Sequence, residues 1–463
     1  MTRENSIAAA AAYFDNGDFL ADCSRLVAIP SESQKAEGLM HCQRYLDEAM
    51  IPAFKAMGFT TKTYDNPVAG YGPVLLASRF EDPSLPTILG YGHGDVIRGM
   101  AEQWTKGAGP WKLAEDGERL YGRGTADNKS QHWMNMVAMR CVLENRGKLG
   151  FNAKFLIETG EENGSRGLSD VITANMEDFG ADVFIASDGP RVRRDLPTLF
   201  LGSRGATNFD LVCSLRDGGH HSGNWGGALA DPAVILAHAI GCISGRHGRI
   251  EVEAWRPPEL TAATRELLQS VVLDAGPDGP VADPGWGEPG FSPAENVHAW
   301  NAFSVLAMTS GNPTSPVNAI APSARAHCQL RYIAGTDATV ILPALRKHLD
   351  DHGFEMVRIE EPPVENRGGY AASRIEPDNP WVVAVRQSME RSTGSQPVVI
   401  PQMGGSICNE LFTDLLGLPA IWIPHSYSGC SQHAPDEHIL MPLCREALQI
   451  MAGLYWDLGE EKA

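Results

Sequence analysis

Acidic side chains and histidines occur in five separate segments of this sequence, three of which directly follow short apolar runs. The segments are Gly92-His93-Gly94-Asp95, Asp127-Asn128-Lys129, Glu158-Thr159-Gly160-Glu161-Glu162, Ser187-Asp188 and His433-Ala434-Pro435-Asp436-Glu437. Converging carboxylates repel one another and lose hydration unless a cation neutralises them. Imidazole and carboxylate together suit Zn²⁺, with Mn²⁺ or Co²⁺ as substitutes. A catalytic ion takes about three protein ligands, so the inventory predicts a site for two ions that share one carboxylate.

Each of these segments also has a simpler structural interpretation. His93 could be a packed histidine, and Asp127 could be only the cap of the helix that follows it. The pair Glu161-Glu162 could serve only to favour a helix dipole, and His433 could be a loop histidine. These features recur at the ends of successive apolar runs, which favours one shared site over several unrelated ones.

The elements that must position these residues alternate between strand-like and helical patterns. Pro86–Tyr91 and Ala153–Ile157 are short apolar runs, whereas Lys129–Asn145 and Leu168–Phe179 have helical spacing. Such alternation predicts βαβ units and an α/β fold with a mainly parallel sheet flanked by helices. Ligands of these sheets bind beyond the carboxyl ends of the strands, where the acids and histidines fall.

The pattern changes in the middle of the chain. Phe200–Ser214 and Asn318–Ile333 predict long strands, and Pro232–Ile243 and Ala338–His352 predict helices. We therefore expect a smaller α+β lid or dimerisation domain inserted into the catalytic domain, with an irregular Pro/Gly-rich stretch at Ala275–Gly290. The predicted ranges are 1–198 for the first part of the catalytic domain, 199–365 for the insertion and 366–463 for the second catalytic part.

Composition excludes several other classes of protein. The formal net charge is -19, from 38 basic and 57 acidic residues, and no basic run suggests binding to nucleic acid. No run of 18 apolar residues predicts a membrane span. The nine cysteines are scattered without a C-x-x-C pair, which favours a reducing cytoplasm over a disulfide framework. The serine-hydrolase pattern G-x-S-x-G and the zinc-protease pattern H-E-x-x-H are both missing.

Together, these motifs resemble the aminoacylase, carnosinase and carboxypeptidase G family of co-catalytic metallopeptidases. The resemblance extends from about Leu20 to Leu458 and implies two zinc ions per subunit. The implied roles are ligation of one ion by His93 and Asp188, ligation of the other by Glu162 and His433, a bridge by Asp127, support of His93 by Asp95, and general base and acid catalysis by Glu161. The family also often has a cis peptide bond after Asp127.

Further residues resemble the substrate-binding groups of the dipeptidase branch. His221, in His220-His221-Ser222-Gly223, matches a histidine that reaches the partner subunit's active site and stabilises an oxyanion. Arg331 matches an arginine that binds the substrate carboxylate, with Asn318 nearby and the loop Gly404-Gly405-Ser406 cradling the same group. The alternatives are a turn histidine, a surface arginine and an ordinary glycine turn.

The leading hypothesis is a hydrolase that cleaves the amide bond of dipeptides or related N-acyl amino acids with a free carboxylate. One alternative is an N-acyl-amino-acid deacylase or specialised amidohydrolase of the same fold. A remote alternative is a catalytically silent binding or assembly protein. We expect a homodimer through the inserted domain, since His221 has its implied role only in a partner's site. Arg98 and Ser130 depart from the family pattern and are expected to line the substrate entrance.

Overall fold

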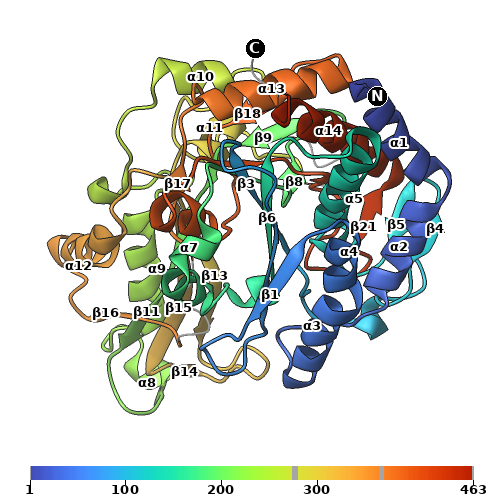
Figure 1. The fold of residues 1–463 in the computed structure, drawn as a ribbon. Coiled ribbons are helices and arrows are strands. Elements are labelled where there is room, and N and C mark those ends of the chain that lie inside the picture. The colour runs from blue at the N-terminus through green and yellow to red at the C-terminus, as the bar shows by residue number, and fades with distance from the viewer. Residues whose placement is uncertain (1, 274–279, 364–369, 461–463) are drawn as a thin grey trace.

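The computed structural model describes residues 2–273, 280–363 and 370–460. An eight-stranded sheet forms the centre of the larger body (Figure 1). Its strands, in spatial order, are β1 (Thr60–Tyr64), β2 (Val74–Arg79), β6 (Asn152–Glu158), β3 (Thr87–His93), β7 (Val183–Ala186), β19 (Ala420–Trp422), β9 (Thr198–Phe200) and β18 (Val398–Ile400). The inner strands β6, β3, β7 and β19 are parallel, as the alternating pattern predicts.

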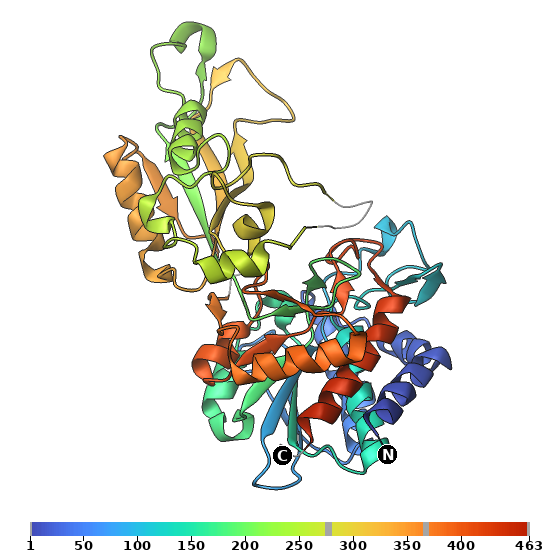
Figure 2. The same cartoon turned by 90° about the horizontal axis from the view of Figure 1, so that it is seen from above.

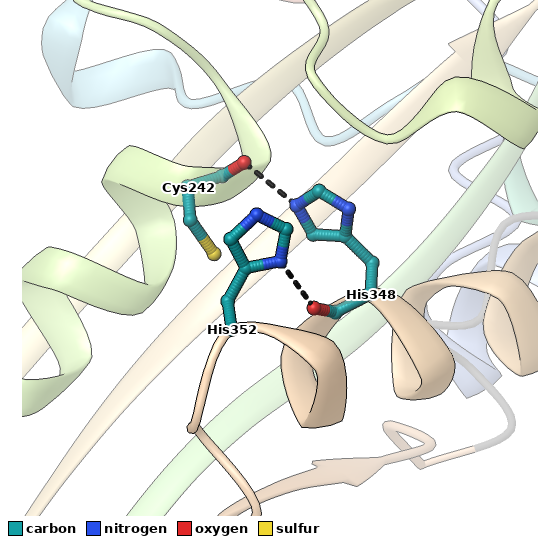
Figure 3. A group of neighbouring side chains, drawn as sticks. All are labelled: Cys242, His348 and His352. Carbon is teal, nitrogen blue, oxygen red and sulfur yellow. Dashed lines mark hydrogen bonds between the residues drawn. The ribbon is translucent and has the colours of Figure 1, made fainter.

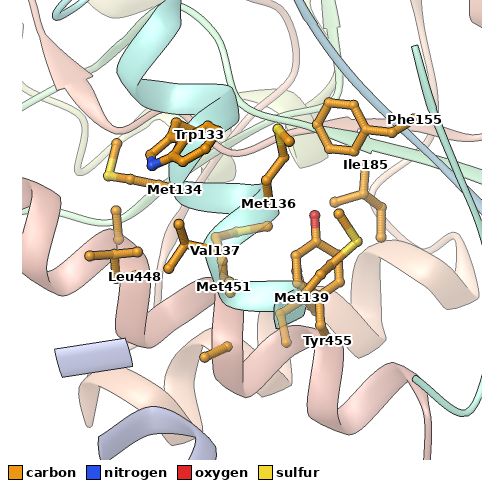
Figure 4. Packing of buried hydrophobic residues seen from close by; sticks show 14 of the residues in the cluster. Trp133, Met134, Met136, Val137, Met139, Phe155, Ile185, Leu448, Met451 and Tyr455 are labelled. Carbon is orange, nitrogen blue, oxygen red and sulfur yellow. The ribbon is translucent and has the colours of Figure 1, made fainter. Parts of the chain in front are cut away.

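Helices cover both faces of this sheet. One face packs against α1 (Arg3–Asp15), α5 (Lys129–Arg146), α13 (Pro380–Thr393) and α14 (Met441–Leu458). Figure 4 shows side chains of α5 and α14 meeting there beneath Phe155 and Ile185 of the sheet. Leu156, which lies between Phe155 and Ile157, instead joins the core on the opposite face, because successive side chains of a strand point to opposite sides. Burial on both faces explains why these strands are continuous apolar runs.

A second body projects from the first (Figure 2). It contains a four-stranded antiparallel sheet with its own core and two helices. The strands in order are β13 (Ala302–Ser310), β15 (Ser323–Tyr332), β11 (Gly205–Ser214) and β16 (Val357–Glu360), and the helices are α9 (Pro232–Ile243) and α12 (Ile341–Asp351). The predicted boundary at residues 365 and 366 lies outside the described residues.

The middle of the chain does not stay within this second body. Helices α10 (Ala262–Leu268) and α11 (Pro293–His298) contribute Leu268 and Ala294 to the core beneath the large sheet. α10 also contacts β18 directly. The predicted irregular stretch at Ala275–Gly290 lies between these helices, and its residues 275–279 lie outside the described residues.

Three predicted elements are interrupted. The predicted strand Phe200–Ser214 is broken at Leu201 and at Arg204, and the predicted helix Leu168–Phe179 is divided at Asn175. The predicted strand Asn318–Ile333 consists of β14 (Ala319–Ile320) and β15, separated around Pro322, because proline lacks the N–H that a ladder needs. The first two interruptions leave no comparable signal in hydrophobic spacing.

Candidate metal centre

Asp127 lies at the centre of the predicted metal site. Its Oδ1 is 3.0 Å from Nε2 of His93, and its Oδ2 is 3.1 Å from Nε2 of His433. His93 is the last residue of β3, whereas Asp127 precedes α5 and His433 lies in the loop before β21 (His438–Leu440). Residues far apart in sequence therefore meet at the carboxyl end of the parallel strands, where the fold class predicts ligands.

Two groups of possible metal ligands share this aspartate. His93, Asp127 and Asp188 form one group, and Asp127, Glu162 and His433 form the other; the ligand atoms of each group lie within 4.8 Å of one another. Asp188 follows β7, and Glu162 lies in the short 3-10 helix after β6. Side chains at the ends of three neighbouring strands thus meet at one edge of the sheet. Each group has the imidazole and carboxylate donors that suit Zn²⁺.

The charges of this cluster call for a cation. Burial raises the pKa of Glu162 to about 7. Burial would also raise the pKa of Asp127, but hydrogen bonds with His433 and His93 lower it. Hydrogen bonds to Asp127 and Glu162 raise the pKa of His433 to about 11. Protonated imidazole therefore supplies the positive charge that the carboxylates need, and metal ions would replace those protons. The residues present thus fit a pair of metal ions.

Asp95 connects His93 to the glutamate turn. It is fully buried, and its carbonyl oxygen lies 3.1 Å from Nδ1 of His93. Its carboxylate accepts hydrogen bonds from the backbone N–H groups of Glu161 and Glu162 at 3.3 and 3.1 Å. A group that holds the second ring nitrogen fixes the tautomer and orientation of a metal-binding histidine. Asp95 therefore positions residues of both ligand groups.

Glu161 lies beside this cluster without belonging to either ligand group. Tyr370 donates a hydrogen bond from its hydroxyl to Oε1 of Glu161 at 3.2 Å. Burial raises the pKa of the Glu161 carboxyl, which moves a carboxylate toward the range in which it exchanges protons at neutral pH. Tyr370 was missed by sequence reasoning, because it is distant from every motif and carries no spacing signal.

A second missed contribution comes from Glu437. One of its oxygens accepts hydrogen bonds from the backbone N–H groups of Gly124, Ala126 and Asp127, and the other pairs with Arg123 at 2.7 Å. This buried carboxylate fixes the loop that presents Asp127. Its position four residues after His433 marks it as part of a motif but does not reveal this role.

The peptide bond between Asp127 and Asn128 is cis, as the resemblance implies.

Part of the predicted substrate-binding set is assembled within one chain. Arg331, on β15, donates a hydrogen bond to the hydroxyl of Ser406 at 2.9 Å. The missed residue Arg204 donates twice to the carbonyl oxygen of Gly404, which leaves its Nη1 buried without a partner among the described residues. Two guanidinium groups thus adjoin the loop 404–406, where an anionic group would gain both charge and hydrogen bonds.

His221 and Asn318 lie elsewhere. His221 pairs with Ala319 in the small ribbon β12 (His220–His221) and β14, and the carbonyl of Asn318 accepts a hydrogen bond from Ser222. Both side chains are exposed, and neither is placed with the ligand groups of its own chain. Arg98 is also exposed. Ser130 instead is buried on α5 against Cys23, so the expectation that it lines the substrate entrance is wrong.

A cleft of about 1130 Å³ lies between the two bodies, beside the ligand groups. Glu162, Ser165 and Tyr370 line it from one side, and Asn208 and His327 of the smaller body line it from the other. This volume would hold a small molecule. Of the residues in the two ligand groups, Glu162 lines this cleft, so the cleft reaches one side of the ligand groups.

The sequence has clear relatives. Residues 89–457 match peptidase family M20/M25/M40. The cysteinylglycine-S-conjugate dipeptidase of Corynebacterium striatum is 30% identical over 330 residues, which is 70% of each chain. The Beta-Ala-His dipeptidase of Rattus norvegicus is 34% identical over 209 residues, which cover 44% of this chain and 42% of the relative.

Solved structures share the fold. Human carnosine dipeptidase 1 superposes with a TM-score of 0.76 and 21% identity, covering 99% of this chain and 100% of that one. An M20 family metallo-carboxypeptidase from Sulfolobus solfataricus superposes with a TM-score of 0.78 and 23% identity, covering 95% and 99% of the two chains. The two-body architecture is therefore common to these structures.

Proposed function

We infer that this chain, which belongs to peptidase family M20/M25/M40, hydrolyses the peptide bond of dipeptides or related N-acyl amino acids with a free carboxylate. It is a metallopeptidase, and its similarity to a cysteinylglycine-S-conjugate dipeptidase favours a short substrate. The observation that carries the proposal is the pair of ligand groups sharing Asp127 at the edge of a substrate-sized cleft.

The proposed metal centre holds two Zn²⁺ ions, for which Mn²⁺ or Co²⁺ could substitute. In this assignment His93 and Asp188 would bind one ion, Glu162 and His433 would bind the other, and Asp127 would be shared by both. When bound, the ions would lower the pKa of a water molecule and polarise the substrate carbonyl. The mixed imidazole and carboxylate donors of both groups support this assignment.

Glu161 is the proposed proton carrier. It lies next to Glu162 in the chain, has a raised pKa caused by burial, and keeps one oxygen against the Tyr370 hydroxyl. The carboxylate takes a proton from the attacking water and later returns it to the leaving amine. Asp95 keeps the glutamate turn in place through two backbone hydrogen bonds.

The substrate carboxylate is assigned to Arg331 and to the loop Gly404-Gly405-Ser406. The hydrogen bond between Arg331 and Ser406 supports this assignment, because it brings a cation to that loop. His221 and Asn318 are assigned to the site of a partner subunit. The exposure of both side chains and their separation from the ligand groups of their own chain support that choice.

A homodimer through the smaller body is part of the proposal. β13 is an edge strand whose Val305, Leu306 and Met308 are exposed, with Leu306 at 58%. An exposed apolar edge strand is suited to pairing with another chain. The inserted range 199–365 would then serve for dimerisation, between catalytic parts 1–198 and 366–463.

We also propose a cytoplasmic location, since all nine cysteines are unpaired. In the part of the chain that the structure describes, no helix is both long and apolar enough to cross a membrane.

A substrate panel tests the proposed function. Dipeptides, the same dipeptides with an amidated carboxyl terminus, and N-acetyl and N-succinyl amino acids are compared, with a chelated sample as control. We expect chelator-sensitive cleavage of the free dipeptides and much weaker cleavage of their amides. Preference for the N-acyl amino acids would favour the deacylase alternative. No hydrolysis by a metal-loaded sample would favour the silent binding protein.

A further inference from the structure

The smaller body carries another group of side chains able to bind a metal ion. Cys242 is the penultimate residue of α9, whereas His348 lies in the last turn of α12 and His352 caps that helix. Their ligand atoms lie within 4.8 Å of one another. Figure 3 shows the thiol and the two rings gathered where the two helices meet. None of the three belongs to the ligand groups around Asp127.

The helices that carry these residues are held by the core of the smaller body. Leu236 and Ala239 of α9 and Leu345 and Leu349 of α12 are buried in one cluster. His348 and His352 are four residues apart, so they lie one helical turn from each other on the same face. Their ring centroids are 4.2 Å apart. The packed backbone thus keeps three soft or borderline ligands together.

Backbone carbonyls already orient both imidazole rings. Nδ1 of His352 lies 2.7 Å from the carbonyl oxygen of His348. The other ring nitrogen of His352, Nε2, is then available to bind a metal ion. Nε2 of His348 lies 2.8 Å from the carbonyl oxygen of Cys242. An ion bound at this nitrogen would replace that hydrogen bond, whereas one bound at Nδ1 would keep it. Carbonyl partners of this kind commonly hold metal-binding histidines.

The electrostatic surroundings favour a cation. Both α9 and α12 end at this point, and helix C-termini carry partial negative charge. The Cys242 thiol donates a hydrogen bond to the carbonyl oxygen of Ala239 at 3.0 Å, and a metal ion bound to the sulfur would displace that proton. Cys242 is partly exposed, whereas the other eight cysteines are buried. An ion can therefore reach this thiol from solvent.

We propose that Cys242, His348 and His352 form a third metal site, separate from the catalytic pair, which takes a thiolate-binding ion such as Zn²⁺. Three protein ligands leave one tetrahedral position for water. Tetrahedral Zn–S and Zn–N bonds place their ligand atoms roughly 3.3 to 3.6 Å apart. The ligand atoms now lie within 4.8 Å of one another, so they need to close by at most about 1.5 Å on binding. The thiol proton passes to solvent, and the ion ties the end of α9 to the end of α12.

A Co²⁺ titration of the enzyme, first freed of metal with a chelator, tests this site. Only a thiolate ligand gives cobalt an intense sulfur-to-metal charge-transfer band, and the residues assigned to the catalytic pair include no cysteine. We expect one equivalent of such a band in the parent and in His247→Gln, an exposed histidine variant of the same body used as a matched control. The band should be lost in Cys242→Ser. In His348→Gln and His352→Gln, the apparent Co²⁺ affinity measured from the band should fall at least tenfold.

A thiol-reagent assay gives an independent readout. Zn²⁺ should slow modification of Cys242 at least tenfold in the parent and in His247→Gln, but not in His352→Gln. The histidine variants keep the thiol, so the test stands even if Cys242→Ser folds poorly. A folded parent without the charge-transfer band would overturn the proposal. So would a band that persists in Cys242→Ser, or zinc protection that survives in both His348→Gln and His352→Gln.

Discussion

At the scale of single residues, the proposal distinguishes groups that would bind ions from a group that would move protons. Glu161 and Glu162 are neighbours in the chain, yet only Glu162 lies within a ligand group. Glu162 is 3.1 Å from the His433 ring, whereas Glu161 contacts the Tyr370 hydroxyl. Burial raises the pKa of both carboxyls, but their partners differ, and this difference supports different roles.

Replacing Glu161 should therefore remove turnover without removing metal. In Glu161→Gln we expect kcat to fall by a factor of about 10² to 10⁴, the usual contribution of a general acid or base. Metal content should stay at the parental level, whereas Glu162→Gln should lower it. Steady-state kinetics together with metal analysis of the same samples make the measurement. A Glu161→Gln enzyme with parental kcat would refute the assignment.

At the scale of elements, short connections after strands carry the site and are fixed by buried polar anchors. Glu437 holds the loop before α5 through three backbone N–H groups and the Arg123 guanidinium. Asp95 does the same for the 3-10 helix that carries Glu162. Anchors of this kind position ligands without touching the ion.

Loss of the Glu437 anchor should weaken metal binding. In Glu437→Ala we expect the apparent Kd for Zn²⁺ to rise about 10- to 100-fold, because Asp127 loses its support, while kcat at saturating metal falls much less. Competition with a chelator measures the affinity. Glu437→Gln keeps an acceptor oxygen and serves as the milder comparison. Parental affinity in a folded Glu437→Ala protein would show that the anchor is irrelevant.

The contact between α11 and the large body should make stability depend on pH. His298 of α11 is buried with Nδ1 2.9 Å from the carbonyl oxygen of Gln402, and burial lowers its pKa from 6.5 to about 4. The unfolded chain therefore takes up a proton first as the pH falls. The stability from this group is complete above pH 6.5 and is lost between 6.5 and 4, by about 3 kcal/mol in total.

Urea unfolding across this pH range compares the parent with two variants. The free energy of unfolding of His298→Gln should fall less steeply below pH 6.5 than that of the parent. The exposed control His247→Gln should follow the parent. Equal slopes for the parent and His298→Gln would contradict the assignment of this pH dependence to His298.

At the scale of the whole molecule, the residues of the proposed site come from both bodies. The larger body supplies both ligand groups, and the smaller one adds Arg331 and presents His221 on an exposed ribbon. The cleft between them is lined from both sides. If His221 acts in a partner's site, the active unit is a dimer, and neither body is sufficient alone.

Subunit mixing tests this arrangement. Met308→Asp on the exposed edge strand, at a residue that does not line the cleft, should yield monomers in sedimentation and lower activity to the level of His221→Ala. Mixing inactive Glu161→Gln subunits with His221→Ala subunits under exchange conditions should restore activity, because a mixed dimer contains one complete site. No recovery in dimers shown to be mixed would exclude action across the interface, as would a fully active monomer.

The sequence alone determined the parts that depend on local pattern. The apolar runs before His93, Glu158 and Asp188 identified the buried strands, because a strand covered on both faces must be apolar throughout. The same runs placed acids and a histidine at one sheet edge. The strand break around Pro322 has a local cause, the missing N–H of proline, that the predicted strand did not take into account. The return of α10 and α11 to the larger body was not predicted, because it depends on packing between distant segments.

Only the tertiary structure decided which side chains meet. Tyr370 reaches Glu161 across 209 positions, and Glu437 reaches Gly124 across 313. Cys242 and His352 are 110 residues apart in sequence, yet the shared core of α9 and α12 brings them together. Periodicity reports which face of an element is buried, but not which other element covers that face. For that reason the motifs predicted a metal centre and the support of His93 by Asp95, while the Glu437 anchor and the separate Cys242 cluster emerged from the fold.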